Sequence, residues 1–268
     1  MSLIGKAQVG WIWVPTLLAA AIGLWPACRA KAQTVTFDFD SGAPTLAPYQ
    51  NLPADQTSSG ITARFSAISG GFSIQTDLTT GFSLSRFSGK YVYPNINRGS
   101  ALRIEFSREL TGIALTFATT ENPDVETPTP IVLTAFSVTP SGASAVGSVT
   151  NRGAYGPDTF PMGTVAFNFG SGTFNRVEVR TQPGGDATFL VDNVTVTPIP
   201  ELNIGVADSN TVVVSWPAPS TGFVLQQNST LGATGWVSMT NTVEVVNGQN
   251  QVTVSPATGN GFYRLLHP

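Results

Sequence analysis

Apolar and polar residues alternate along much of the chain after residue 33, in short runs with the two-residue period of a β-strand that buries one face. In the run 102–106, three apolar residues lie on one face, while Arg103 and Glu105 lie on the other. Gly and Pro clusters separate the runs. This pattern predicts an all-β domain, a two-sheet β-sandwich or jelly roll of about ten strands. The runs lie at 61–65, 72–76, 82–85, 102–106, 112–118, 131–138, 164–169, 176–180 and 189–196.

Residues 189–196 are predicted to be the closing strand of this domain, and residues 36–42 are predicted to be its partner. Both stretches alternate apolar and polar residues, yet each carries carboxylates where a core strand disfavours them: Asp192 in the later stretch, Asp38 and Asp40 in the earlier one. Strict alternation places Asp38 and Asp40 on the same face. The pairing would bring all three carboxylates to one end of the domain.

Residues 1–32 have the organisation of an export signal. Lys6 supplies the positive charge, residues 9–25 form an uncharged apolar run, and Ala-Lys-Ala at 30–32 fits a small-x-small cleavage site. We expect cleavage near Ala32, a secreted or cell-surface protein, and no membrane span after cleavage. The alternatives are a retained anchor, for which the run is short, or a lipoprotein attached through Cys28. Cys28 is the only cysteine, so the cleaved protein has no thiol chemistry.

Two alternate prolines at 198 and 200 mark a stiff, extended connector. We therefore expect a first domain at 33–197, a linker at 198–202 and a small second β-sandwich at 203–268. Trp216 and Trp236 are expected to anchor its core, and Asn247-Gly248 predicts a hairpin turn. Its predicted strands lie at 212–216, 223–227, 243–246, 251–254 and 261–266.

The charge balance argues against nucleic acid as a partner. The whole chain carries 13 basic and 16 acidic residues, a net charge of -3. The predicted cleavage would remove Lys6, Arg29 and Lys31, leaving 10 basic against 16 acidic residues and a net charge of -6. An acidic chain without a basic cluster does not attract a phosphate backbone.

Catalytic chemistry has few candidates. His267 is the sole histidine and is next to last, which leaves a Ser-His-Asp triad without a base and excludes a zinc site built from His and Cys. The chain does contain acidic residues, so its composition does not exclude a pair of catalytic carboxylates of the kind that glycosidases use. However, Glu105, Glu109 and Glu178 lie in ordinary alternating or turn contexts. We therefore expect a protein that is not an enzyme.

The first domain, with Asp40 followed by Ser-Gly and with Asp192 inside Phe-Leu-Val-Asp-Asn-Val, resembles the jelly-roll folds of carbohydrate-binding modules and galactose-binding-like domains. The resemblance implies that Asp40 and Asp192 clamp a structural calcium ion, with Asp38 as a possible third ligand. The alternative is that Asp192 caps a turn and Asp40 is solvated. One departure is that residues 33–197 contain no Trp, which such modules often present to their ligands.

The second domain carries Val-Ser-Trp-Pro-Ala-Pro at 214–219, Trp236 and Phe-Tyr-Arg-Leu at 262–265. On these residues it resembles a shortened fibronectin type III-like sandwich. It also resembles small terminal modules of secreted bacterial proteins, which implies attachment, spacing or sorting.

Two loops combine aromatic rings with polar side chains, as sugar binding requires. The first, at 91–98, and the second, at 151–158, are both bounded by Pro or Gly. The alternative is that these tyrosines only pack. The candidate ligand-binding residues are Tyr91, Tyr93, Asn97, Arg98, Tyr155 and Asp158.

Together these patterns predict an exported, non-catalytic protein whose first domain recognises a polysaccharide or cell-surface polymer. The alternative is a structural or adhesive spacer without a small ligand. A glycoside-active enzyme is disfavoured. Exposed tyrosines would favour binding, whereas tyrosines buried in the core would favour the structural role.

Overall fold

The computed structural model describes residues 33–96, 99–121, 126–170, 172–182, 187–208, 210–218, 220, 222–255 and 259–267. The predicted export signal at 1–32 and its cleavage site lie outside the described residues. Within the described part, no helix is both long enough and apolar enough to cross a membrane.

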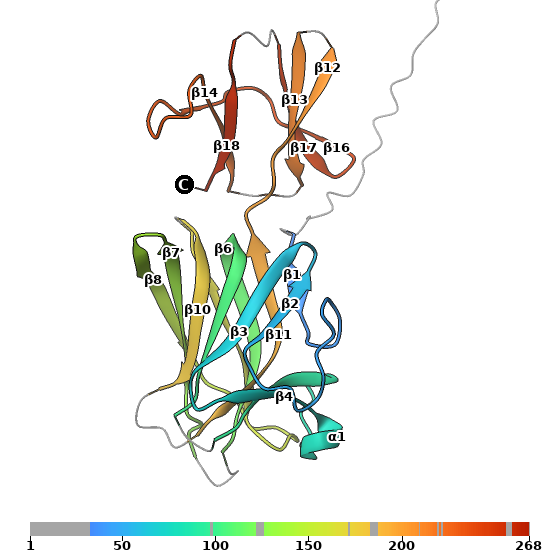
Figure 1. Ribbon diagram of the computed structural model, residues 1–268, viewed down its shortest axis with the longest axis vertical. Helices are drawn as coiled ribbons and strands as arrows, with labels where there is room; N and C mark the ends of the chain where they lie inside the picture. The colour runs from blue at the N-terminus through green and yellow to red at the C-terminus, as the bar shows by residue number, and fades with distance from the viewer. Residues whose placement is uncertain are drawn as a thin grey trace, which may run out of the picture. The chain divides into compact units, whose positions relative to one another are not determined.

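The chain is built almost entirely of β-strands, so the predicted all-β fold is confirmed. Strands β1 to β11 share one hydrogen-bonded network, and the helix α1 (Asp77–Thr80) follows β4 (Figure 1). The strands are β1 (Val35–Phe37), β2 (Ala54–Ser58), β3 (Ile61–Ser69), β4 (Phe72–Thr76), β5 (Lys90–Pro94), β6 (Ala101–Thr119), β7 (Ile131–Thr139), β8 (Gly142–Asn151), β9 (Met162–Asn168), β10 (Phe174–Thr181) and β11 (Phe189–Pro198).

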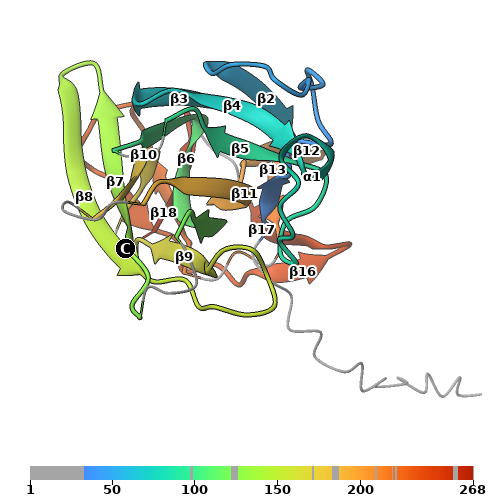
Figure 2. The same cartoon turned by 90° about the horizontal axis from the view of Figure 1, so that it is seen from below.

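β6 joins two layers of this network. Its 19 residues cover two predicted strands, 102–106 and 112–118. The first half pairs with β3 and β10, and the second half pairs with β9 and β11. One layer therefore contains β2, β3, β10, β7 and β8, and the other contains β4, β5, β11, β1 and β9 (Figure 2). Between the layers lies the main apolar core, which includes Phe37, Phe65 and Phe117. The predicted β-sandwich is confirmed.

The predicted pairing of the first and closing strands is also confirmed. β1 runs antiparallel to β11, with Phe37 opposite Val194 and Val35 opposite Val196. β1 ends at Phe37, however, and Phe39 has a left-handed φ of 61°. This conformation lets Phe39 join Phe37 in the core and breaks the alternation that would have placed Asp38 and Asp40 on one face.

The C-terminal strands form two further sheets. Val214, Trp216, Leu225 and Val252 form an apolar cluster, so Trp216 is a core residue as predicted. Trp236 is instead half-buried, with the Arg264 guanidinium 4.4 Å from its ring centre. The likeness to fibronectin type III stays a prediction. One sheet has the strand order β12 (Asn203–Asp208), β13 (Thr211–Pro217), β17 (Gln249–Val254), β16 (Glu244–Val246). The other has the order β15 (Val237–Ser238), β14 (Val224–Asn228), β18 (Phe262–Leu266).

The Asn-Gly hairpin turn lies where the sequence predicts it, between β16 and β17. Asn247 and Gly248 have φ values of 51° and 75°, and Val246 pairs with Gln249 across the turn. Two consecutive positive φ angles are those of a type I′ turn, which suits the twist of a two-residue hairpin.

Candidate functional site

The layer that contains β4, β5 and β11 is buried on its inner face and over part of its outer face. Ile74, Val92 and Val191 lie in register across its three strands and enter the main core. Alternation then sends Tyr91 and Leu190 to the opposite face. There a second apolar cluster forms; its buried members are Leu84, Phe87, Tyr91, Ala118, Met162 and Leu190.

Two loop segments, 81–89 and 154–161, contribute to this second cluster and are fastened to each other. Asp158 accepts hydrogen bonds from the Ser85 N–H at 2.6 Å and from the Ser85 hydroxyl at 2.9 Å. Thr159 donates its N–H to the Ser83 carbonyl at 2.8 Å. Asp158, predicted to bind a ligand, therefore clamps the two segments together, and both of its carboxylate oxygens are occupied.

Tyr91 is a core residue and not a ligand-facing one, which corrects the sequence interpretation. Its side chain has no exposed surface, and its ring packs edge-on to Phe87 at 5.4 Å. Its hydroxyl bonds to the Thr80 hydroxyl. Burial raises the pKa of Tyr91, because the ionised form would lose its hydration. The ring offers no face on which a sugar stacks.

Tyr93 lies one pleat further along β5 and is only partly buried. Its ring stacks on Phe82 with centroids 6.1 Å apart and planes at 23°. Phe82 in turn meets Phe160 edge-on at 4.7 Å. All three rings are partly exposed at the margin of the second cluster. We call Phe82, Tyr93 and Phe160 the aromatic platform.

A network of uncharged polar side chains lies beside this platform, on the outer face of β4 and β5. Ser73, directly opposite Tyr93 in the strand register, donates to Asn95 Oδ1 at 2.8 Å. Gln75 Nε2 donates to the Ser73 hydroxyl at 3.0 Å, and Asn95 Nδ2 donates to Asn51 Oδ1 at 3.2 Å. Asn51 and Asn95 are exposed. The face thus presents amide groups in fixed positions next to aromatic rings.

The remaining predicted ligand residues are only partly described. Tyr155 is half-buried in the 154–161 segment that carries Asp158 and Phe160. Asn97 and Arg98 lie outside the described residues; they follow Asn95 by two and three positions. The structure therefore brings Tyr93, Tyr155 and Asp158 to the same region of the sandwich, where Asp158 and the segments it joins support the platform.

Asp192 lies in β11 with no exposed surface. Its carboxylate accepts the Ser88 N–H at 3.0 Å, the Asn193 N–H at 2.6 Å and Asn193 Nδ2 at 2.8 Å. Burial raises the pKa of this carboxyl to about 7 and outweighs the lowering effect of the main-chain hydrogen bonds; the nearby charges of Asp40 and Asp38 raise it further.

Asp40 and Asp38 each hold a loop in place. Asp40 accepts the Lys90 N–H at 3.1 Å, and Lys90 Nζ lies 3.7 Å from the same carboxylate. A Cβ at Gly89 would collide with this carboxylate. Asp38 accepts the Ser41 N–H at 2.8 Å and the Ser41 hydroxyl. Although burial opposes it, this hydrogen bonding lowers the pKa of Asp38.

The calcium ion implied by the resemblance stays a prediction, and the hydrogen bonding of these carboxylates argues against it. N–H groups point at the oxygens of Asp192 and Asp40, so a cation placed there would face donors instead of free lone pairs. Within the described ranges, no three Asp, Glu, His or Cys side chains are grouped so that they could hold a metal ion. The arrangement is that of carboxylates that fasten the 86–90 segment to both terminal strands.

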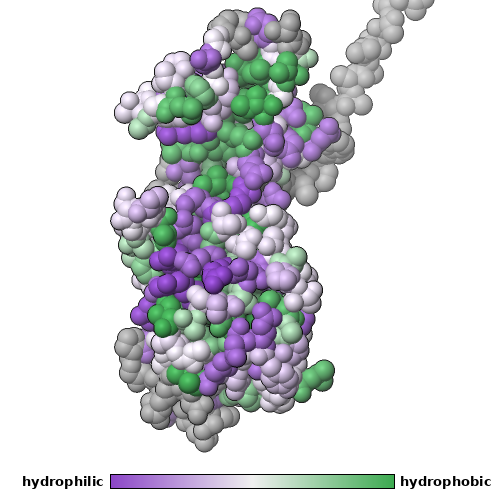
Figure 3. Space-filling model, in the orientation of Figure 1, coloured by the Kyte–Doolittle hydropathy of each residue, from purple (hydrophilic) through white to green (hydrophobic). Residues whose placement is uncertain are grey.

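The outer face of the other layer is hydrophilic, as Figure 3 shows over β3, β6 and β10. Its charges compensate one another in three cross-strand pairs and one pair within β10, which leaves the face with little net field. The nitrogen–oxygen distances are 3.0 Å for Arg64–Asp55, 2.6 Å for Arg176–Glu105, 3.0 Å for Arg103–Glu178 and 2.8 Å for Arg180–Glu178.

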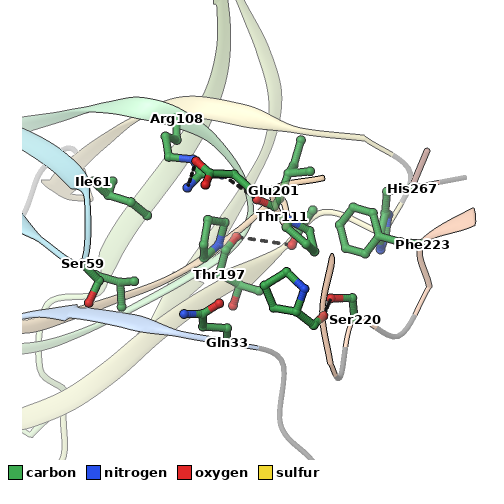
Figure 4. Close-up of a pocket in the computed structure, with 15 residues that line it drawn as sticks. Gln33, Ser59, Ile61, Arg108, Thr111, Thr197, Glu201, Ser220, Phe223 and His267 are labelled. Atoms are coloured by element: carbon green, nitrogen blue, oxygen red, sulfur yellow. Dashed lines mark hydrogen bonds and ion pairs between the residues drawn. The ribbon is translucent and has the colours of Figure 1, made fainter. Parts of the chain in front are cut away.

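A hollow of about 250 Å³ is lined in part by β6 and the segment after β11. Here Arg108 Nη1 lies 2.8 Å from Glu201 Oε1, and Thr111 donates to the Thr197 carbonyl at 3.4 Å (Figure 4). The second guanidinium nitrogen of Arg108 donates to the Ile199 carbonyl. Through this ion pair and these hydrogen bonds, the start of the 198–202 segment is held against β6.

Sequence reasoning did not identify Phe82, Phe160 or the residues of the polar network. Phe82 was assigned to a strand at 82–85, which the structure replaces with a loop that covers the sheet. Ser73 and Gln75 lie on β4, whereas Asn95 follows the end of β5 and Asn51, which is 44 positions from Asn95, lies before β2. The available signal was the pair Phe160-Pro161, an aromatic residue beside a chain-turning proline in a polar segment.

Comparison with known proteins gives similarity in structure only. No protein-family model and no curated protein matches the chain. The K2 cleaved adhesin domain of Lys-gingipain is 14% identical, with a TM-score of 0.38 over 62% of this chain and 99% of that one. The xylan-binding module CBM86 of Roseburia intestinalis is 14% identical, with a TM-score of 0.26 over 62% and 96%.

The tandem CBM22 domains of a Paenibacillus barcinonensis protein are 6% identical to this chain, with a TM-score of 0.25 over 90% of this chain and 92% of that one. These solved structures are carbohydrate-binding and adhesin domains. At this level of similarity, the ligands of those proteins cannot be inferred for this chain.

Proposed function

We propose that the larger sandwich is a non-catalytic glycan-binding module and that the ligand binds on the outer face of β4 and β5. The observation that carries the proposal is the stacked Tyr93–Phe82 pair beside the exposed amides of Asn51 and Asn95. A pyranose ring presents an apolar face to an aromatic ring and hydroxyls to amide groups at its edge. The aromatic rings are fixed by packing against each other and the amides by hydrogen bonds, which lowers the entropic cost of binding.

Among the described residues, the polar side chains that flank the platform are neutral. Ser73, Gln75, Asn51 and Asn95 carry no charge, and the nearby carboxylate of Asp158 is occupied by Ser85. A neutral polysaccharide fits this set better than a sulfated or uronic one, because an anionic polymer requires cationic partners. The proposed ligand class is therefore a neutral polysaccharide of the surface or the extracellular space, where the predicted export would deliver the protein.

The carboxylates considered for catalysis are engaged elsewhere. Glu105 pairs with Arg176, and Glu178 pairs with Arg103 and Arg180. Glu109 accepts the Asn175 amide. A glycosidase requires two carboxyl groups facing one another across a substrate cleft. We therefore propose binding without turnover.

A structural spacer is the second candidate. The burial of Tyr91 favours it, because one of the two tyrosines first considered as a sugar platform belongs to the core. The compensated charges on the outer face of β3, β6 and β10 also favour it, since they leave no strong field for a partner. In this role the sandwich would separate or display other parts of a cell surface without a small ligand.

Retention on a panel of insoluble and soluble polysaccharides distinguishes these candidates. We expect the exported protein to be retained by one neutral polymer, Tyr93→Ala and Asn95→Ala to lose at least tenfold in affinity, and Tyr93→Phe to keep most of it. The matched control is Trp236→Ala, which removes a half-buried ring that lies just before β15, away from β4 and β5 in the chain. No retention by a folded protein, or unchanged retention in Tyr93→Ala, would reject the glycan site; released sugars would indicate an enzyme.

A further inference from the structure

β8 forms a lateral edge of the larger sandwich (Figures 1 and 2). This ten-residue strand pairs with β7 and, among the described residues, has no main-chain partner strand on its other side; only the Asn151 side chain at its end bonds to the Thr164 carbonyl of β9. It is also widely exposed: Gly142 to Ala145, Ser148, Thr150 and Asn151 are all on the surface. Ten extended residues present a free edge of about 34 Å, along which N–H and C=O groups point outward.

At three other edges of this sandwich, those of β2, β4 and the start of β9, the chain itself bonds to the strand. Beside β2, Ala43 exchanges two main-chain hydrogen bonds with Thr57. Beside β4, the segment 49–52 makes three such bonds: Tyr49 N–H to Ile74 O, Ile74 N–H to Gln50 O and Leu52 N–H to Phe72 O. The edge of β9 is bonded by Ala154 at Met162 and capped at the Thr164 carbonyl by the Asn151 side chain at 2.7 Å.

β8 carries none of the usual features that prevent edge pairing. Sheet edges are normally protected by charges, prolines or covering segments. Residues 131–151, which span β7 and β8, contain no Asp, Glu, Lys, Arg or His, and Pro140 precedes β8 in the turn. The exposed side chains of β8 are Ala, Ser, Thr and Asn, which are short enough to let another backbone approach. Its one irregularity is the register shift opposite Ala135 and Phe136.

We propose that β8 is the contact through which two copies of this chain associate, edge to edge and antiparallel, as one continuous sheet. A twofold pairing places each β8 against the same uncharged strand. Main-chain hydrogen bonds supply the attraction, and no like charges oppose each other in any register, although each whole chain is acidic. A strand with short, uncharged side chains can approach this edge closely, and β8 of a second copy of the chain has such side chains.

This contact gives a weak dimer. One pair of edge strands buries less than the roughly 1,200 Å² of a standard stable interface. The association is therefore expected in the micromolar range and depends on concentration. On a surface it would present two aromatic platforms together, and a dimer would increase retention on a repeating polymer through avidity.

The first test is sedimentation velocity on the full chain, expressed with its own leader and purified from the exported fraction. We expect a monomer–dimer equilibrium in the wild type and at least a tenfold weaker association in the double variant Ser144→Lys and Ser148→Lys, because the added ammonium groups oppose each other across the twofold axis. The matched control, Thr164→Lys and Ala166→Lys, adds the same charge at exposed positions on the capped strand β9 and should dimerise like the wild type.

Cross-linking gives a second readout that does not depend on a disruptive variant. In a Cys28→Ser background the chain has no other cysteine. Single cysteines placed in turn from 143 to 148 should form an oxidised dimer at one or two neighbouring positions, where the twofold axis brings identical residues within disulfide reach. Ala166→Cys should not. A wild type that stays monomeric with no cross-link at any position, or a dimer unaffected by the β8 lysines, would overturn the proposal.

Discussion

The main-chain N–H of Ser88 donates a 3.0 Å hydrogen bond to the carboxylate of Asp192. This bond joins the segment before β5 to the closing strand β11. Asp192 has no exposed surface, and its other partners, the Asn193 N–H and amide, come from its own neighbour in the chain. Hydrogen bonds favour the charged carboxylate, whereas burial favours the neutral one, and burial has the larger effect.

The stability of the fold should therefore fall as pH rises towards neutrality. The pKa of Asp192 is about 7 in the fold against 3.8 ordinarily, so the folded state holds a proton that the unfolded chain has released. The stabilisation is complete below pH 3.8 and is lost as pH rises through 7. Between pH 5 and 7 the loss is on the order of 2 kcal/mol, or roughly 4–8 °C in Tm.

Thermal melts across pH 5 to 8 check this prediction, with Asp192→Asn as the comparison. The amide keeps the shape of the side chain but does not titrate, so its Tm profile should be flatter than that of the wild type over this range. Other carboxylates contribute equally to both proteins and cancel. Parallel profiles for the two proteins would mean that Asp192 titrates in the fold as it does in the unfolded chain.

Calcium should contribute little to stability. The oxygens of Asp40 and Asp192 accept N–H donors from Lys90, Ser88 and Asn193, so binding an ion would require those bonds to break. We expect the Tm in about 1 mM calcium to lie within roughly 1–2 °C of its value in a chelator, since a ligand stabilises only by its affinity for the native state. A rise of several degrees that Asp192→Asn abolishes would instead establish the ion site implied by the resemblance.

The sequence predicts most strands of the sandwich because apolar and polar residues alternate clearly in them. The pairing of β1 with β11 and the unusual carboxylate within a core strand are both visible in the pattern, and Asp192 is indeed buried. β8 was not predicted, because Gly142–Asn151 consists of small residues without an apolar period. Its strand conformation is imposed by pairing with β7 and not by its own side chains.

The prediction for Tyr91 was wrong because the role of that residue depends on the loop that covers the sheet. Tyr91 and Tyr93 are equivalent in the pattern, since both alternate to the same face of one strand. The loop residues Leu84 and Phe87 pack in the same apolar cluster as Tyr91, whereas Tyr93 remains partly exposed. The same loop explains why the strand predicted at 82–85 is wrong. Its alternating apolar residues pack onto the face of the sheet, but the segment does not pair with a strand of that sheet.

Tyr91 and Tyr93 should consequently respond differently to truncation. Tyr91→Ala removes a fully buried ring and should cost about 3–5 kcal/mol, as for other buried aromatic residues. Tyr91→Phe loses only the bond to Thr80 and should cost about 1 kcal/mol. Tyr93→Ala, at a half-buried position, should cost less than Tyr91→Ala. Chemical denaturation measures all three, and equal losses for the two alanine variants would contradict the assignment of Tyr91 to the core.

The carboxylate of Asp158 should be required to keep the cover closed over the second apolar cluster. It holds Ser85 by two hydrogen bonds, and both oxygens are used. Asp158→Ala removes both hydrogen bonds to Ser85, and because Ser85 is exposed and water can replace the acceptor, the cost should be about 0.5–1.5 kcal/mol. Because the two hydrogen bonds between Thr159 and Ser83 remain, the loss should appear as local opening of 81–89 and not as global unfolding.

Hydrogen exchange locates that opening. In Asp158→Ala we expect faster exchange at 81–89 and 154–161, with the β6 and β11 amides unchanged. Asp158→Asn, which keeps one acceptor oxygen, should give an intermediate effect. Because Phe82 and Phe160 lie on these two segments, the same variant should also weaken glycan retention without any change in Tyr93 itself. Uniform acceleration across the sandwich would show that Asp158 supports the whole fold and is not specific to the platform.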